Sequence, residues 1–125
     1  DELLPMLDRG VAALIDDLKA RGLLDSTLVL VTGEFGRTPR INKDAGRDHW
    51  GLCHTALIAG GGIQGGRVIG ASDRIAAYPT TDPIDPTDLH ATMYHCLGLN
   101  PETSMHDHLR RPYPLTTGRV IADLL

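Results

Sequence analysis

The first part of the chain carries apolar side chains at intervals of three and four positions. This spacing places them on one face of an α-helix, with charged residues such as Asp16 and Lys19 largely off that face. Gly22 is a typical helix stop. The pattern therefore predicts an amphipathic helix that ends near this glycine. Its apolar face consists of Leu3, Leu4, Leu7, Val11, Leu14, Ile15 and Leu18.

The segments after this helix alternate between apolar runs and glycine- or proline-rich stretches. Residues 27–32 are apolar and rich in β-branched side chains, which predicts a central strand covered on both faces. Residues 55–59 predict a second strand, and residues 67–71 a third, short one. Residues 33–51 are predicted to be a loop, and a loop this long inside a compact domain is usually functional or disordered. The prolines in residues 72–86 predict irregular structure.

A second helix is predicted to begin at Asp85, which is a good capping residue. Pro86 suits the first helical position, Asp88 is an acid in the first turn, and Gly98 is expected to end the helix. A short helix is expected again in residues 120–125. This order of elements predicts an α/β fold in layers, a mixed sheet flanked by helices. The predicted buried face of the second helix consists of Leu89, Met93, Cys96 and Leu97.

Length and charge narrow the class of protein. The 125 residues are enough for one domain with a real core, so we expect residues 1–125 to form a single domain. A net charge of −4 without runs of like charge argues against nucleic acid or an anionic membrane as a partner. Because Asp1 is not a methionine and lies next to the helical pattern, we expect a piece of a longer protein. Cys53 and Cys96 are expected to be buried free thiols, with a single disulfide as the alternative.

The strand predicted at residues 27–32 leads into a carboxylate, Glu34. Ligands of open α/β sheets gather at the carboxyl ends of strands, so Glu34 could bind a divalent cation or act as a base. The alternative is a loop glutamate that forms a salt bridge, for example with Arg37. Further along the same loop, Asp48 and His49 are both competent metal ligands.

Three arginines lie on the same loop as these candidate ligands. A guanidinium can hold two oxygens of a phosphate or sulfate group, which makes Arg37 and Arg47 candidates for oxyanion binding. For Arg40 we favour a solvated loop position. His54 opens the second strand, so it either faces the candidate site or caps that strand. Structural or exposed roles are expected for His90, His95, His106 and His108.

Residues 60–65 fit the G-x-G-x-x-G pattern of dinucleotide-binding proteins and follow a predicted strand. Residues 66–70 do not have a helical pattern, so no helix N-terminus would face a pyrophosphate there. We therefore expect a tight surface turn and no dinucleotide site.

Three segments of the chain carry a family resemblance: GLLDSTLVLVTGEFGRTPRIN, GRDHW and the closing RPYPLTTGRVIADLL. They resemble the uncharacterised sulfatase-like family called domain of unknown function fifteen-oh-one. More loosely, residues 31–36, His49 with residues 55–62, and residues 88–99 are similar to the C-terminal part of alkaline phosphatase/sulfatase superfamily proteins. In that superfamily a buried strand ends in a metal-binding Asp-His pair.

The resemblance implies the C-terminal portion of a metal-dependent hydrolase of phosphate or sulfate esters. It implies Glu34, His49 and Asp48 as ligands of a divalent metal ion (Zn, Ca, Mg or Mn). It also implies Arg37 or Arg47 as the residue that stabilises developing charge. The nucleophile would belong to a missing N-terminal half, so we expect the isolated chain to be inactive. Family members generally look exported, which implies an extracytoplasmic or periplasmic location.

The alternative is a non-catalytic binding or scaffold protein that keeps the fold without a metal centre. Phe35 favours it, because the superfamily has a metal-binding histidine at this position and a phenyl ring cannot ligate. The concentration of charged residues and histidine on one loop favours the enzyme. The expected partners are the missing N-terminal half and an anionic ester substrate. A sheet cut from that half would also expose an edge and favour self-association.

Overall fold

The computed structural model describes residues 3–125 and contains two α-helices and eight short strands in that range. This content confirms the predicted α/β class. In chain order the elements are α1 (Leu3–Ala20), the 3-10 turn η1 (Leu24–Ser26), β1 (Val29–Thr32), β2 (Gly36–Arg37), β3 (His49–Trp50), β4 (Ala56–Ala59), β5 (Ala71–Ser72), β6 (Pro79–Thr81), α2 (Pro86–Cys96), β7 (Ser104–His106), β8 (Pro112–Pro114) and the 3-10 turn η2 (Ala122–Leu124).

The strands of residues 3–125 pair in four antiparallel two-stranded sheets, not in the single mixed sheet expected from the sequence. The pairs are β1 with β4, β2 with β3, β5 with β6, and β7 with β8. In the first pair, Val29 lies opposite Ala59 and Thr32 opposite Ala56. The prediction that residues 27–32 form a central strand covered on both faces is wrong. Within this range β1 has a single partner strand, and it is half-buried from Val29 to Val31 and exposed at Thr32.

The prediction of a third strand in residues 67–71 is also wrong. Gly66 and Gly70 both adopt a φ of +76°, a left-handed conformation that interrupts an extended strand. Pairing begins only at Ala71, opposite Thr81. All of the β5–β6 hairpin except Ala71 therefore lies in residues 72–86, the segment expected to be irregular.

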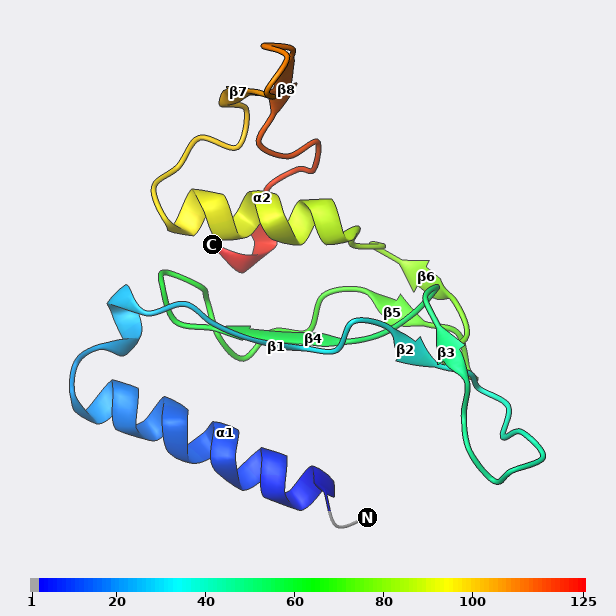
Figure 1. Cartoon of the computed structure of the whole chain (residues 1–125). Coiled ribbons are helices and arrows are strands. Elements are labelled where there is room, and N and C mark those ends of the chain that lie inside the picture. The colour runs from blue at the N-terminus through cyan, green and yellow to red at the C-terminus, as the bar shows by residue number, and fades with distance from the viewer. Residues whose placement is uncertain (1–2) are drawn as a thin grey trace.

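Helix α1 forms and ends as predicted. Gly22 has a φ of +67°, and the Leu23 N–H donates a hydrogen bond of 2.8 Å to the Leu18 carbonyl, which closes the last turn. Figure 1 shows β1 and β4 lying between α1 on one side and α2 on the other. Part of the apolar face of α1 remains open to solvent, from 80% exposure at Leu3 to 47% at Leu14, whereas Val11, Ile15 and Leu18 are half-buried. Neither α-helix of residues 3–125 is long and apolar enough to cross a membrane.

The start of α2 confirms the predicted cap. Asp85 Oδ1 accepts a hydrogen bond of 2.9 Å from the Thr87 N–H, and Asp88 Oδ2 accepts one of 3.1 Å from the Asp85 N–H. The bond from the Thr87 N–H lowers the pKa of the Asp85 carboxyl below its ordinary value of 3.8. After the helix, Gly98 has a φ of +74°, as its predicted role as a helix end requires.

The buried face of α2 is not the predicted one. Ala91 and Thr92 are 0% exposed, whereas Leu97 is 64% exposed. The small side chains of Ala91 and Thr92 allow the C-terminal segment to approach the helix. Thr92 Oγ1 accepts a hydrogen bond of 3.0 Å from the Ile121 N–H. Both cysteines are free as predicted but only half-buried, and burial raises the pKa of the Cys96 thiol. The other members of the predicted buried face of α2 are half-buried as well, namely Leu89, Met93 and Cys96.

The C-terminal segment is fastened along the first turns of α2. The Thr116 hydroxyl donates to the Thr87 carbonyl at 3.0 Å, and the Arg119 N–H donates to Asp88 Oδ1 at 2.7 Å. Between them, a β-carbon on Gly118 would lie 2.1 Å from the carbonyl carbon and oxygen of Thr87. Only glycine allows the two backbones to come this close.

The glycine-rich segment forms the predicted tight turn, with Gly60 and Gly61 at φ values of +70° and +59°. The Gly61 N–H donates to the Leu24 carbonyl at 2.9 Å, and the Gln64 N–H donates to the Leu124 carbonyl at 2.7 Å. The turn is therefore bonded to both η1 and η2. η2 itself is the short helix expected in residues 120–125, in 3-10 form.

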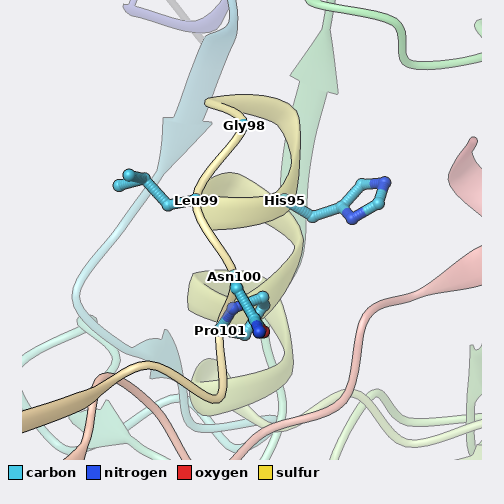
Figure 2. A pocket seen from close by; sticks show the side chains of 5 residues that line it. All are labelled: His95, Gly98, Leu99, Asn100 and Pro101. Atoms are coloured by element: carbon cyan, nitrogen blue, oxygen red, sulfur yellow. The ribbon is translucent and has the colours of Figure 1, made fainter.

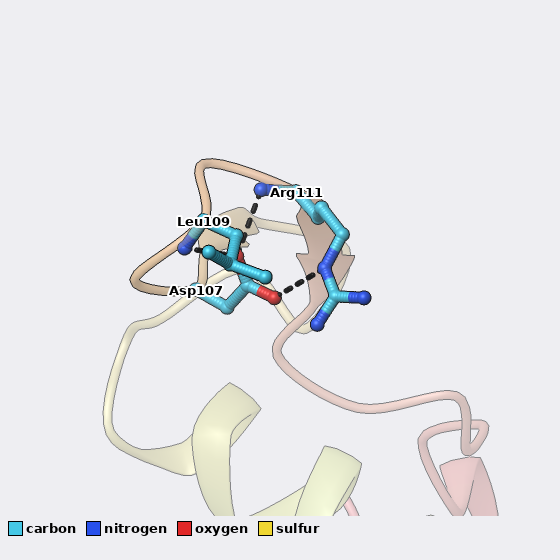
Figure 3. Close-up of polar contacts among 3 residues, drawn as sticks. All are labelled: Asp107, Leu109 and Arg111. Atoms are coloured by element: carbon cyan, nitrogen blue, oxygen red, sulfur yellow. Dashed lines mark hydrogen bonds and ion pairs between the residues drawn. The ribbon is translucent and has the colours of Figure 1, made fainter.

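The β7–β8 hairpin is closed by Asp107 (Figure 3). Asp107 Oδ1 accepts hydrogen bonds from the N–H groups of Leu109 and Arg111, at 2.8 and 2.9 Å, and its Oδ2 pairs with Arg111 Nε at 2.6 Å. The backbone hydrogen bond from Arg111 is the main reason that the pKa of Asp107 lies below 3.8. His106 and His108 flank this turn and are exposed, as predicted.

Candidate functional site

The segment 33–51, predicted to be a loop, contains a short β-hairpin. Gly36 lies opposite Trp50 and Arg37 opposite His49 in an antiparallel pair. The prediction of an uninterrupted loop is therefore wrong. The hairpin holds the two ends of the segment, which carry the candidate residues, side by side.

The connection between the two strands is held by Asn42. Its Oδ1 accepts hydrogen bonds from the Asp44 N–H at 3.0 Å and the Gly46 N–H at 2.9 Å, and Ala45 between them has a φ of +57°. Asparagine commonly builds turns in this way. The Asn42 amide also donates to Asp48 Oδ1 at 2.8 Å. Asn42 and Gly46 were the sequence signal for a turn within this segment.

Phe35, Arg37 and His49 form a cluster on one side of the hairpin. The phenyl ring of Phe35 and the imidazole of His49 stack, with centroids 3.9 Å apart and planes at 29°. The Arg37 guanidinium carbon lies 5.4 Å from the centre of the phenyl ring. Directly paired residues on antiparallel strands point to the same face, which places Arg37 and His49 together. Phe35 therefore aligns a guanidinium and an imidazole, although it cannot ligate a metal itself.

Arg47 is engaged with the backbone of the same hairpin. Its Nη1 donates hydrogen bonds of 2.7 Å to the carbonyls of Thr38 and Pro39. Arg37 Nη1 in turn donates to the Arg47 carbonyl at 3.3 Å. Arg47 thus stabilises the connection between the two strands. Of the two predicted oxyanion-binding arginines, Arg37 is the one that lies opposite His49 and over the Phe35 ring.

Glu34 occupies the short link between β1 and β2. It follows Gly33 at the end of β1 and directly precedes Phe35, and its side chain is exposed. Asp48 and His49 are exposed as well. Stacking on Phe35 brings His49 next to the residue that adjoins Glu34. The convergence of Glu34 and His49 on one point stays a prediction.

The predicted ligands do not make a complete metal centre by themselves. Within the described range 3–125, no three side chains of histidine, cysteine, aspartate or glutamate gather closely enough to hold an ion. Protein zinc sites use three or four such ligands, and calcium sites use six or more oxygens. Glu34, Asp48 and His49 could therefore supply only part of a coordination sphere.

Comparison with known proteins identifies the family of the chain. Residues 1–125 match the family described as protein of unknown function, DUF1501. The chain belongs to the DUF1501 family. This confirms the family predicted from residues 22–42, 46–50 and 111–125. No curated protein and no solved structure matches the chain. Membership of DUF1501 carries no known activity, so the hydrolase reading remains a proposal.

In this DUF1501 protein, one anchor of the candidate hairpin was missed by sequence reasoning. The indole N–H of Trp50 donates a hydrogen bond of 2.7 Å to the Ala77 carbonyl, and the indole packs edge-on against Tyr78 with centroids 5.8 Å apart. The sequence signal that pointed to this anchor was the scarcity of aromatic residues, with Trp50 as the single tryptophan. An aromatic residue with a polar tip, in a chain with 4% aromatics, usually has a specific partner when it is partly buried.

A hollow of about 360 Å³ lies at the end of α2, away from the candidate hairpin. It is lined by His95, Gly98, Leu99, Asn100 and Pro101. Figure 2 shows the side chains of His95 and Leu99 pointing in opposite directions. Because its side chains do not converge on one point, this hollow does not compete with the hairpin as the candidate site of the DUF1501 fold.

Proposed function

We propose that the chain is the C-terminal portion of a metal-dependent hydrolase of phosphate or sulfate esters, located outside the cytoplasm. The observation that carries this proposal is the cluster on the β2–β3 hairpin. There Arg37 and His49 lie opposite each other across the strands and both pack on Phe35. A guanidinium beside an imidazole suits an anionic ester.

In this proposal Arg37 binds the oxygens of the phosphate or sulfate group. Its side chain is exposed and contacts the phenyl ring, so it can present several N–H donors to an anion. Arg47 supports this position through its own carbonyl, which accepts from Arg37 Nη1. The division of roles follows from their contacts: Arg37 faces the imidazole, and Arg47 faces the backbone.

Glu34 and His49 are the proposed metal ligands from this chain, and Asp48, which accepts a hydrogen bond from the Asn42 amide, orients the hairpin. A bound divalent ion would polarise the ester oxygen. Because these residues form only part of a coordination sphere, the remaining ligands and the nucleophile would come from an N-terminal half of the same protein. The extracytoplasmic location rests on the family resemblance.

The test is metal analysis of the intact protein that contains this chain, purified with the variants Glu34→Ala and His49→Ala. We expect both variants to lose bound metal and hydrolysis of aryl phosphates or aryl sulfates. Glu102→Ala and His108→Ala are matched controls, since these exposed residues lie outside the hairpin. They should retain both properties. The isolated chain should show no turnover, and hydrolysis by the isolated chain with added metal would contradict the proposal.

The second candidate function is a non-catalytic scaffold that keeps this fold. The observation that favours it is the incomplete ligand set within residues 3–125. Metal content that is unchanged in both Glu34→Ala and His49→Ala, or absent from the intact wild-type protein, would support the scaffold.

A further inference from the structure

The candidate hairpin is tied to a neighbouring hairpin through Trp50. Trp50 directly follows His49 in β3, so the two side chains point to opposite faces of the strand. While His49 stacks on Phe35, the Trp50 indole donates its hydrogen bond of 2.7 Å to the Ala77 carbonyl. Ala77 is 4% exposed, one of the most buried residues in the described chain. Figure 1 shows β5 and β6 beside β2 and β3 accordingly.

The acceptor for the indole is held in place by Asp73. Asp73 Oδ1 accepts hydrogen bonds from the Ile75 N–H at 3.2 Å and the Ala77 N–H at 2.8 Å. The Asp73 N–H donates to the Tyr78 carbonyl at 2.9 Å. Ala76 within this turn has a φ of +57°, a conformation that costs energy for alanine and persists only when its surroundings fix it. The turn therefore presents the Ala77 carbonyl in one orientation.

We propose that Trp50 and Asp73 are positioning residues of the candidate site. Asp73 fixes the Ala77 carbonyl, that carbonyl fixes the indole of Trp50, and the indole fixes the strand that carries His49. This inference rests on the proposed function for its catalytic consequence. Its structural content, that the imidazole of His49 keeps its place on Phe35 because of a turn more than twenty residues away, is independent of that function.

The structure contains a matched control for Asp73. Asp107 builds the same kind of turn in the β7–β8 hairpin, because its Oδ1 accepts from the N–H groups two and four residues later. Asp73 Oδ1 accepts from the same two relative positions. Removing either carboxylate removes the same two backbone hydrogen bonds from one hairpin turn, and Asp107→Ala in addition removes the ion pair with Arg111. Only the Asp73 turn is bonded to Trp50.

The experiment compares Asp73→Ala, Asp73→Asn, Trp50→Phe and Asp107→Ala by NMR at one fixed pH. The reporter is the ring-current shift that Phe35 imposes on the His49 imidazole protons. We expect Asp73→Ala and Trp50→Phe to move these signals towards those of a free histidine. Asp73→Asn keeps an acceptor oxygen and should retain the wild-type signals, as should Asp107→Ala. Wild-type His49 signals in both Asp73→Ala and Trp50→Phe would overturn the inference.

A second measurement separates this inference from the proposed function. In the intact protein, Asp73→Ala should lower kcat by about tenfold to hundredfold with little change in KM, as expected when a reacting group is displaced by about 1 Å. If the NMR signals move as expected and the intact protein neither binds metal nor hydrolyses esters, the proposed function fails and the positioning stands. If the intact protein hydrolyses esters and the His49 signals do not move, the positioning fails alone.

Discussion

Gly36 packs directly against the carbonyl group of Cys53. A β-carbon on Gly36 would lie 2.0 Å from that oxygen and 3.1 Å from the carbonyl oxygen of Trp50. Gly36→Ala must therefore push β2 away from the segment that follows β3. We expect a loss of about 1–3 kcal/mol in the free energy of unfolding, as for other overpacked sites. Trp50 is the single tryptophan of the chain, so its fluorescence during urea unfolding measures this loss directly.

Gly51→Ala is the control for this change. It lies next to Trp50, and a β-carbon there would meet nothing within 4 Å. Its unfolding midpoint should stay at the wild-type value. Equal destabilisation by the two alanines would show that the contact with Cys53 does not matter.

The close approach of the C-terminal segment to α2 should depend on Gly118. Because a β-carbon there would lie 2.1 Å from the Thr87 carbonyl, Gly118→Ala should separate the segment from the helix. Hydrogen exchange at the Ile121 amide, which is bonded to Thr92 Oγ1, should become faster. Gly10→Ala is the control for the exchange measurement, and it should not make exchange at Ile121 faster. A β-carbon on Gly10 meets nothing within 4 Å, so this change should stabilise α1 by about 1 kcal/mol. Unaltered exchange at Ile121 in Gly118→Ala would contradict the proposed packing.

The turn of the β7–β8 hairpin should weaken in acid. Hydrogen bonds from the backbone lower the folded-state pKa of Asp107 below 3.8, so its carboxylate stabilises the hairpin above that pH. The stabilisation is lost as the pH falls through the lowered pKa. NMR titration of the Leu109 and Arg111 amides, which donate to Asp107, should show a midpoint below 3.8. Asp107→Asn should abolish this transition, and a wild-type midpoint above 3.8 would be inconsistent with the hydrogen bonding seen here.

The exposed leucines on the apolar face of α1 should cause self-association of the isolated chain. Leu7 is 51% exposed and Leu14 47% exposed on this face, and burying such leucines between two chains is favourable. Sedimentation velocity over a wide concentration range should show association of the wild type that Leu7→Glu reduces. Arg9→Gln lowers the net charge by the same one unit and should leave association unchanged. A monodisperse wild-type monomer at all concentrations would count against this role of α1.

Local signals predicted both helices and the two longest strands. The cap at Asp85 and the stops at Gly22 and Gly98 act within a few residues, so their outcome could be read from neighbouring positions. Burial could not be predicted in this way. Apolar periodicity predicted Leu97 on the buried face of α2, but the buried residues are Ala91 and Thr92, and Thr92 is bonded to the C-terminal segment through the Ile121 N–H.

The candidate site was predictable in its residue types and not in its arrangement. Glu34, Arg37 and His49 stood out because their side chains suit metal and oxyanion chemistry. Their relative positions depend on the Asn42 turn and on the stack between Phe35 and His49, which joins two residues 14 positions apart. Phe35 was interpreted as the loss of a ligand, and the structure adds that its ring holds the imidazole.

The glycine-rich turn at residues 60–65 has a consequence for how the molecule comes apart. Its backbone is bonded to Leu24 in η1 and to Leu124 in η2. Loss of the turn would remove one hydrogen bond from η1 and one from η2 at the same moment, so the amides of these two short helices should open cooperatively, at a common rate, although about 100 residues separate them.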